Sequence, residues 1–342
     1  MQRCLELAAR GAGRVAPNPM VGSVLVHEDR IIGEGYHAQF GGPHAEVHCI
    51  NEAIDRGFGA LLPFSRLYVS LEPCAHFGKT PPCADLIIKH RIPEVVIGSL
   101  DPFPEVDGKG IGKLNAAGVQ TSIGVLEQNC LDLNRRFFCF HTRHRPYIIL
   151  KWAETADGFI APADKTGKRL MITNSLTNRL VHRWRSEEAA ILVGTHTAEL
   201  DDPALTTRLW PGASPVRVVL DLSLRLPKSL QVFDGLVPTI VISSVAKPDK
   251  GQIRYRQPAS HQPLATAIAG ILYQERLSSV LVEGGTRLLQ TFLDEGCWDE
   301  LRIIRNLRLK IGQGLKGPQW TGFPEEPGVK IGDDQLIYVR RD

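Results

Sequence analysis

The 342-residue sequence contains no apolar run long enough to span a membrane, and its first six residues show no apolar signal-peptide core. Blocks of like charge are also absent, because 40 basic and 37 acidic residues are dispersed and leave a net charge of +3. These absences give no reason to expect a nucleic-acid or membrane partner. The length exceeds that of one ordinary core and predicts two domains.

Cysteine is present, but its number argues against a disulfide framework. There are seven cysteines, an odd number, and thiolate metal ligands of the kind described next require a reducing compartment. We therefore expect a cytoplasmic protein. Five of the seven cysteines show no metal-ligand spacing and are expected to be ordinary thiols: Cys4, Cys49, Cys130, Cys139 and Cys297.

The most informative motif is His44-Ala-Glu46, followed by Pro73-Cys74 and then by Cys83. One imidazole and two thiolates can hold Zn²⁺ with a fourth position open for water, and the metal lowers the pKa of that water. Zinc deaminases of bases combine such ligands with a carboxylate that carries protons, and Glu46 is the candidate. His48 and His76 remain alternatives as a fourth ligand, which would make the site structural.

The local sequence predicts how these ligands come together. Residues 47–56 have the apolar spacing of a helix, residues 66–71 alternate as a strand, and Pro81-Pro82 precedes a second helix at 83–90. Both helix starts would favour anionic groups.

Several longer motifs accompany the ligands, and together they resemble one family. They are Pro17-Asn-Pro-Met-Val-Gly22, Gly33-Glu-Gly-Tyr-His37, Gly42-Pro-His-Ala-Glu46, the segment 71–83 with its spacer Ala-His-Phe-Gly-Lys-Thr-Pro-Pro, and Asp101-Pro102. The chain resembles the bifunctional deaminase–reductases of riboflavin biosynthesis, and the eight-residue spacer is the most specific of these features. The resemblance covers nearly the whole chain.

Alternating strands and helices in the first half predict a three-layer α/β sandwich. The resemblance implies the same: a cytidine-deaminase-like α/β/α domain at 1–144 and a dihydrofolate-reductase-like α/β domain at 145–342. One continuous helix is expected at 126–141, before a linker at 142–146. Gly108-Lys-Gly-Ile-Gly112 lacks the register of a phosphate loop and is predicted to be a loop and a helix start.

The second half has no Rossmann fingerprint, but the predicted strand 279–283 leads into Gly284-Gly285 at a helix start. Backbone N–H groups there could receive a pyrophosphate, although glycine pairs also form plain turns.

The resemblance implies two activities. The first is deamination of 2,5-diamino-6-ribosylamino-4(3H)-pyrimidinone 5′-phosphate, with Glu46 as proton carrier, Zn²⁺ on His44, Cys74 and Cys83, and Asn18 orienting the pyrimidine. His76, Lys79 and Asp101 would bind the ribose phosphate. The second is reduction of the ribosyl group to ribityl by NADPH.

For the reductase, the resemblance assigns residues to cofactor and substrate by position. The residues that would contact NADPH are Ala153, Thr197, Asp201, Gly285, Thr286 and Arg287. Those that would hold the phosphorylated substrate are Lys151, Asp157, Arg185, Leu205, Arg208 and Glu283. The arginines suit phosphate because a guanidinium bonds two oxygens at once.

The chain departs from the family pattern at Phe103, Arg169, Met171 and Leu222, where the family has asparagine, serine, tryptophan and serine. Two alternatives therefore stay open: a deaminase of another base or nucleotide, and a reductase-like domain that serves only as a scaffold. We expect small phosphorylated pyrimidines as ligands, neither nucleic acid nor membrane as a partner, and a homo-oligomer.

Overall fold

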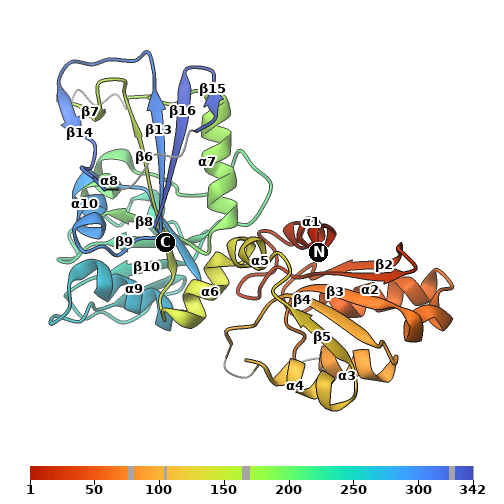
Figure 1. Cartoon of the computed structure of the whole chain (residues 1–342). Coiled ribbons are helices and arrows are strands. Elements are labelled where there is room, and N and C mark those ends of the chain that lie inside the picture. The colour runs from red at the N-terminus through yellow and green to blue at the C-terminus, as the bar shows by residue number, and fades with distance from the viewer. Residues whose placement is uncertain (76–80, 104–105, 164–169, 323–327, 342) are drawn as a thin grey trace. The chain divides into compact units, whose positions relative to one another are not determined.

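The computed structural model describes residues 1–75, 81–103, 106–163, 170–322 and 328–341. The chain divides into two compact units, Met1–Arg143 and His144–Asp342 (Figure 1).

The first unit is built on a five-stranded sheet in the order β2-β1-β3-β4-β5. β1 pairs antiparallel with β2 and β3, whereas β3, β4 and β5 are parallel. The strands are β1 (Gly22–His27), β2 (Arg30–Tyr36), β3 (Arg66–Leu71), β4 (Glu94–Ser99) and β5 (Gln120–Ile123). The helices are α1 (Gln2–Ala9), α2 (Ala45–Asp55), η1 (Gly59–Phe64), α3 (Cys83–Lys89), α4 (Lys109–Ala116), α5 (Glu127–Leu133) and α6 (Arg135–Thr142).

Helices cover both faces of this sheet. Ile50 of α2, Ile87 of α3 and Leu114 of α4 share one apolar core with side chains from one face of the strands. Leu7 of α1 packs with Val24 on the opposite face, where α5 also contacts α1 and β4 (Figure 1). The result is the three-layer α/β/α sandwich that the sequence predicts.

The prediction of one continuous helix at 126–141 is wrong, because the segment forms two helices that meet at Asn134. The Asn134 backbone has φ −106° and ψ 20°, outside the helical region. Its buried side chain accepts a hydrogen bond from Met20 N–H and donates one to Met20 C=O, both at 2.8 Å. Asparagine often bonds to nearby or distant backbone in this way, at a cost to helix continuity.

The second unit contains a nine-stranded sheet in the order β11-β10-β9-β8-β12-β6-β13-β16-β15. Neighbours from β11 to β13 are parallel, and β16 and β15 add two antiparallel pairings at one edge. These strands are β6 (Tyr147–Glu154), β8 (Ala190–Gly194), β9 (Val216–Leu220), β10 (Thr239–Ile242), β11 (Ile253–Arg256), β12 (Ser279–Val282), β13 (Glu300–Asn306), β15 (Lys330–Ile331) and β16 (Asp334–Arg340). β7 (Phe159–Pro162) pairs separately with β14 (Gly314–Lys316).

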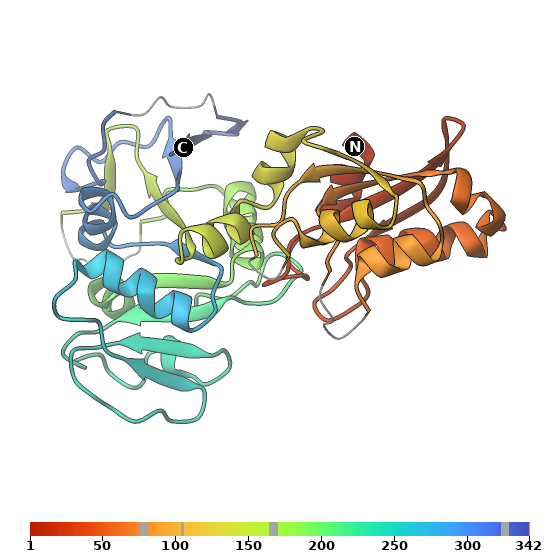
Figure 2. The ribbon, with the colours of Figure 1, turned by 60° about the horizontal axis from the view of Figure 1, so that its bottom comes forward.

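Helices also cover both faces of the second sheet. α9 and α10, side by side in Figures 1 and 2, bury Ile268 and Phe292 against one face. α8 buries Ala198 against Ile191 and Val219 of the other face. The helices of this unit are α7 (Ser175–Glu187), α8 (Thr195–Asp201), η2 (Gln231–Phe233), α9 (Leu264–Gln274) and α10 (Thr286–Asp294).

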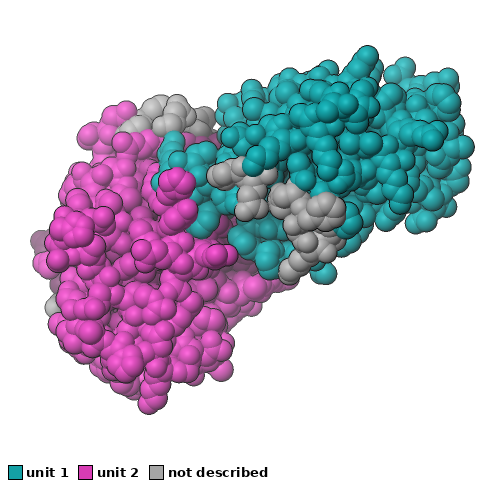
Figure 3. All heavy atoms as spheres, turned by 90° about the horizontal axis from the view of Figure 1, so that it is seen from below, with its two compact units in different colours: residues 1–143 teal, residues 144–342 magenta. Residues whose placement is uncertain are grey.

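Each unit, coloured separately in Figure 3, has its own apolar cores. Separate cores are what allow two segments of a chain to fold as domains. Among the described residues, none of the helices combines the length and apolarity needed to cross a bilayer.

Candidate metal centre and reductase site

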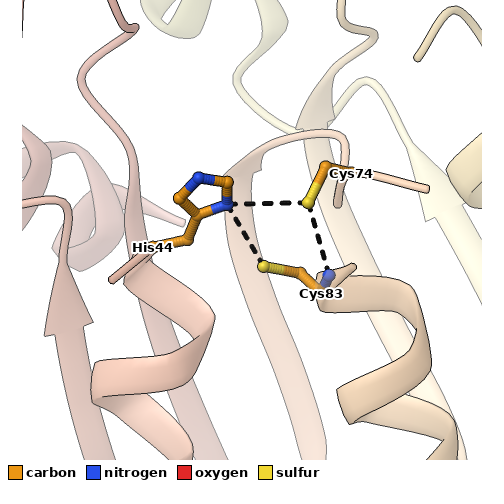
Figure 4. A group of neighbouring side chains, drawn as sticks. All are labelled: His44, Cys74 and Cys83. Atoms are coloured by element: carbon orange, nitrogen blue, oxygen red, sulfur yellow. Dashed lines mark hydrogen bonds between the residues drawn. The ribbon is translucent and has the colours of Figure 1, made fainter. Parts of the chain in front are cut away.

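Three elements of the first unit bring His44, Cys74 and Cys83 together, as the sequence predicts (Figure 4). His44 is the N-cap residue of α2, and Cys83 is the first residue of α3. Cys74 follows the end of β3. Helix α3 begins at Cys83, after Pro82 at its N-cap, because the fixed φ of proline is compatible with a helix start.

The distances between the donor atoms fit a tetrahedral zinc site. His44 Nδ1 lies 3.5 Å from Cys74 Sγ and 3.4 Å from Cys83 Sγ. Nitrogen and sulfur ligands at ordinary Zn–N and Zn–S distances on a tetrahedral ion are about 3.6 Å apart. Among the described residues the group has three members, and His48 is not one of them. The donor set and spacing therefore suit a zinc ion with one coordination position that none of the described residues fills.

The electrostatics around the thiols favour the ligand form of Cys74. The hydrogen bond from Cys83 lowers the pKa of Cys74 to about 4, and His44 and the Cys83 backbone N–H act in the same direction against the effect of burial. The Cys83 N–H donates to Cys74 Sγ at 3.3 Å. A thiolate at a helix start, next to an imidazole, is ready to bind a cation.

Glu46 lies in the first turn of α2, two residues after His44, and its residue is only 3 % exposed. Burial raises the pKa of its carboxyl group to about 7, while the interactions with His44 and Cys83 lower it. A carboxyl group with a pKa near neutrality can both accept and release a proton at cellular pH.

His37 is a residue whose role the sequence did not reveal. Its Nδ1 lies 3.0 Å from the Pro43 carbonyl and its Nε2 lies 3.1 Å from Asn18 Nδ2. A carbonyl can only accept, so Nδ1 carries the proton and Nε2 accepts from the Asn18 amide. This arrangement fixes the Asn18 amide with Oδ1 as its remaining acceptor. The only sequence signal was the position of His37 within a family motif.

Asp101 lies just beyond the end of β4 and is buried. Burial raises the pKa of its carboxyl group to about 7, opposed by the Phe103 N–H that it accepts at 2.9 Å. The Phe103 ring packs edge-on against His141, so the phenylalanine at this departure from the family has an aromatic neighbour. His76 and Lys79 lie outside the described residues.

In the second unit, one predicted cofactor residue, Thr197, lies next to the glycine pair, and Thr286 and Arg287 follow it in the chain. Gly285 is the N-cap of α10, and Thr286 and Arg287 begin that helix. A Cβ added to Gly285 would lie 3.0 Å from Thr197 Oγ1, so α8 and the glycine pair are in close contact. Ala153 is in β6 and Asp201 ends α8, where its side chain is exposed.

Arg185 and Glu283 form a buried two-bond ion pair between α7 and the end of β12. Arg185 Nε and Nη2 donate to the two carboxylate oxygens at 2.8 and 2.7 Å, and Nη1 donates to Thr206 C=O at 3.3 Å. Burial would raise the pKa of Glu283, but Arg185 and Lys151 lower it to about 2. The Arg185 guanidinium, which we expected to bind phosphate, therefore already forms an ion pair with Glu283.

The other predicted substrate residues of the second unit lie in different environments. Leu205 is buried with a positive φ of 53°, and Arg208 is exposed, with its N–H donating to His182 Nδ1 at 2.9 Å. The Asp157 carboxylate accepts N–H groups of Ile311 and Gly312 at 3.1 and 2.8 Å, which anchors a turn. Of the departures from the family, Met171 and Leu222 are exposed and Arg169 lies outside the described residues.

Comparisons with known proteins agree with this division of the chain. Residues 1–99 match the cytidine and deoxycytidylate deaminase zinc-binding region, and residues 146–306 match the RibD C-terminal domain. The riboflavin biosynthesis protein RibD of Aquifex aeolicus is 41 % identical over 100 % of this chain and 97 % of its own length. That of Escherichia coli is 34 % identical, covering 96 % and 91 %.

Solved structures give the same result. The crystal structure of a diaminohydroxyphosphoribosylaminopyrimidine deaminase/5-amino-6-(5-phosphoribosylamino)uracil reductase from Thermotoga maritima has a TM-score of 0.87 and 37 % identity, covering 99 % of this chain and 97 % of that one. RibD of Acinetobacter baumannii has a TM-score of 0.88 and 31 % identity over the same shares.

The fold and the metal centre define a zinc-dependent deaminase domain joined to an NADPH-dependent, dihydrofolate-reductase-like domain. The chain belongs to the RibD family of bifunctional riboflavin-biosynthesis enzymes. Both alternatives left open by the sequence, a deaminase of another base and a scaffold domain, are less well supported than this assignment.

Proposed function

We propose that residues 1–144 deaminate 2,5-diamino-6-ribosylamino-4(3H)-pyrimidinone 5′-phosphate and that residues 145–342 reduce the product with NADPH. The observation that carries the first half is the three-ligand group, with Nδ1–Sγ distances of 3.4 and 3.5 Å. The Thermotoga maritima relative, whose name gives both reactions, supports the choice of substrate.

In the deaminase site, His44, Cys74 and Cys83 hold Zn²⁺, which when bound supplies the Lewis acidity that makes water nucleophilic near neutral pH. Glu46 would move the two protons of the attacking water, one to the ring nitrogen and the other to the amine that leaves as ammonia. Asn18, held by His37 through Nδ2, has Oδ1 available to accept a ring N–H. Asp101, together with His76 and Lys79, binds the ribose phosphate.

In the reductase site, NADPH when bound would supply the hydride that converts the ribosyl group into a ribityl chain by reduction at C1′. The residues that would hold the cofactor are Ala153, Thr197, Asp201, Gly285, Thr286 and Arg287, and the backbone N–H groups at the start of α10 would attract its phosphates. Arg208 and Lys151 supply positive charge to the substrate. Arg185 and Glu283 border it as an ion pair, with Leu205 and Asp157 nearby.

We also propose that the ligands are small phosphorylated pyrimidines. Neither nucleic acid nor membrane is proposed as a partner, because the numbers of basic and acidic residues are nearly balanced at 40 and 37. Seven free thiols favour the cytoplasm. A homo-oligomer stays a prediction that light scattering of the purified protein would check.

A two-step assay with metal analysis tests the proposal. Cys83→Ala should lose zinc and ammonia release while still oxidising NADPH when the deaminated intermediate is supplied. Cys49→Ala, which removes a buried thiol of α2 outside the ligand group, should keep both zinc and ammonia release. Loss of both activities in Cys83→Ala would contradict two separate sites.

A further inference from the structure

Glu72 is a buried carboxylate two residues before the metal ligand Cys74, and the mechanism above gives it no role. Its residue is 4 % exposed. It accepts four backbone N–H groups of one later segment, from Asp101, Gly108, Gly110 and Ile111, at 3.4, 3.1, 3.0 and 3.3 Å. Both carboxylate oxygens therefore have two donors each.

Gly110 brings the two segments into direct contact. A Cβ added to Gly110 would lie 1.9 Å from the Pro73 carbonyl oxygen and 3.1 Å from Glu72 Oε1. No side chain larger than hydrogen fits at the first distance without a backbone shift. The start of α4 thus lies against the Glu72–Cys74 segment with no space between them.

The chemistry of this contact is that of an acid at a helix start. The N–H groups of Gly108, Gly110 and Ile111 have no partners within α4 and would otherwise need water or an anion. Glu72 supplies the anion from within the protein. The glycine-rich stretch 108–112 is therefore occupied by a carboxylate, which explains physically why it is not a phosphate loop.

The segment that Glu72 holds also carries Asp101, whose carboxylate we assigned to the ribose phosphate. The Asp101 N–H bonds to Glu72, while its Oδ1 accepts the Phe103 N–H. Because β3 ends at Leu71 and β4 at Ser99 on neighbouring parallel strands, Glu72 joins the loops that follow both strands. One of these loops carries a zinc ligand and the other carries the substrate contact.

We propose that Glu72 is a positioning residue of the deaminase, which fixes the substrate-binding loop at Asp101 relative to the zinc ligand Cys74. The proposal rests on the substrate role given to Asp101 above. It predicts that disturbing the contact weakens substrate binding without removing the metal.

Two variants with one matched control test the proposal in the zinc-loaded, full-length protein. Glu72→Gln keeps the shape but places an NH₂ group opposite two N–H donors, and Gly110→Ala introduces the Cβ that meets Pro73. Gly112→Ala lies in the same helix, and its added Cβ would meet nothing within 4 Å. The reductase activity of each preparation serves as an internal measure of intact protein.

Both test variants should retain the wild-type zinc content and raise KM for the pyrimidine phosphate by about 10- to 100-fold, with a smaller change in kcat, since a displacement of about 1 Å has effects of that size. Hydrogen exchange should accelerate at least about tenfold in Glu72→Gln at one of the two N–H pairs, either Asp101 and Gly108 or Gly110 and Ile111, because the pair that faces the NH₂ group loses its acceptor. Gly112→Ala should match wild type in every measurement.

A wild-type KM in both test variants would overturn the proposal, as would a raised KM with unchanged hydrogen exchange in Glu72→Gln. Loss of zinc or unfolding of the first unit in both variants would also overturn it, because Glu72 would then be only structural. Asp101→Asn tests separately the assumption that Asp101 binds the substrate. If Asp101→Asn leaves KM unchanged, the substrate role of Asp101 is wrong; if Asp101→Asn raises KM and Glu72→Gln does not, the positioning role of Glu72 is wrong.

Discussion

At the scale of single residues, burial next to the metal ligands sets the proton chemistry of the first unit. Glu46 and Asp101 are both buried, and burial raises the pKa of each carboxyl group to about 7. Their surroundings nevertheless differ. Glu46 interacts with His44 and Cys83, whereas Asp101 accepts a backbone N–H from Phe103. These surroundings agree with the proton transfer proposed for Glu46 and with the substrate binding proposed for Asp101.

Replacement of Glu46 by glutamine should remove the proton carrier and leave the metal ligands in place. We expect Glu46→Gln to keep its zinc and to release ammonia about 10²- to 10⁴-fold more slowly, the range that general acid–base catalysis contributes. Asp55→Asn, an exposed position at the end of the same helix, is the control and should behave as wild type. Near-normal ammonia release by Glu46→Gln would rule out the role.

The sequence could predict the group of three metal ligands, and propose Glu46 beside it, because this chemistry is carried by residue type and short spacing. It could not identify His37 or Glu72 as partners of Asn18 and Gly110, because those contacts join residues 19 and 38 positions apart. It also assigned Arg185 to phosphate without showing that Glu283 engages its fork. Long-range pairing of polar side chains has no local pattern.

At the scale of elements, Asn134 connects the junction of α5 and α6 to the loop that carries Asn18. The two hydrogen bonds to Met20 are both 2.8 Å long, and Asn134 is 3 % exposed. Their loss leaves a backbone donor and acceptor without their partner at a half-buried position.

We expect Asn134→Ala to reduce the free energy of unfolding of the first unit by about 2 kcal/mol, because each unsatisfied polar group costs about 1 kcal/mol or more. The urea concentration at which ammonia release is lost would measure this. Asn115→Ala, which removes an exposed bond to Thr121, should change stability by less than about 0.5 kcal/mol. Equal effects of the two substitutions would contradict a specific role of Asn134.

The ion pair between α7 and the end of β12 predicts a pH dependence. The pKa of Glu283 in the folded protein is about 2, below its ordinary value of 4.5. The folded state therefore favours the ionised carboxylate. Its contribution to stability is complete above pH 4.5 and is lost as the pH falls from 4.5 towards 2.

Glu283→Gln should leave Arg185 buried without its counter-ion and reduce the free energy of unfolding of the second unit by about 3–5 kcal/mol at pH 7. The difference from wild type should shrink between pH 4.5 and 2, measured by urea unfolding at several pH values. Glu187→Gln removes an exposed pair with Arg183 and should cost less than about 0.5 kcal/mol at every pH. A difference that stays constant with pH would contradict the ion-pair explanation.

The elements show where sequence patterns succeed and where they stop. The strand at 66–71 was predicted with the observed bounds, because alternation of side chains along a strand is a local feature. The break at Asn134 was not predicted, because its cause is a bond to Met20, 114 positions away. The edge strand β16 also forms through pairing with the distant strand β13, which a local pattern cannot specify.

At the scale of the whole molecule, one chain carries two chemistries that need different bound groups. The zinc ligands all lie in the first unit, and the residues assigned to NADPH all lie in the second. A group that binds only the folded form of one unit stabilises that unit by mass action. The two units should therefore respond separately to metal removal and to cofactor addition.

Thermal unfolding of the full-length protein can test this separation. A zinc chelator should abolish ammonia release and lower the unfolding temperature of the first unit, while NADPH oxidation with the deaminated intermediate persists. NADPH at about 100 times its Kd should stabilise the second unit by about 2.7 kcal/mol, which raises its unfolding temperature by about 2–4 °C per kcal/mol. Cys83→Ala should reproduce the effect of the chelator and respond normally to NADPH. If the chelator abolishes both reactions, or if NADPH stabilises both units equally, the two sites are energetically coupled and the prediction is wrong.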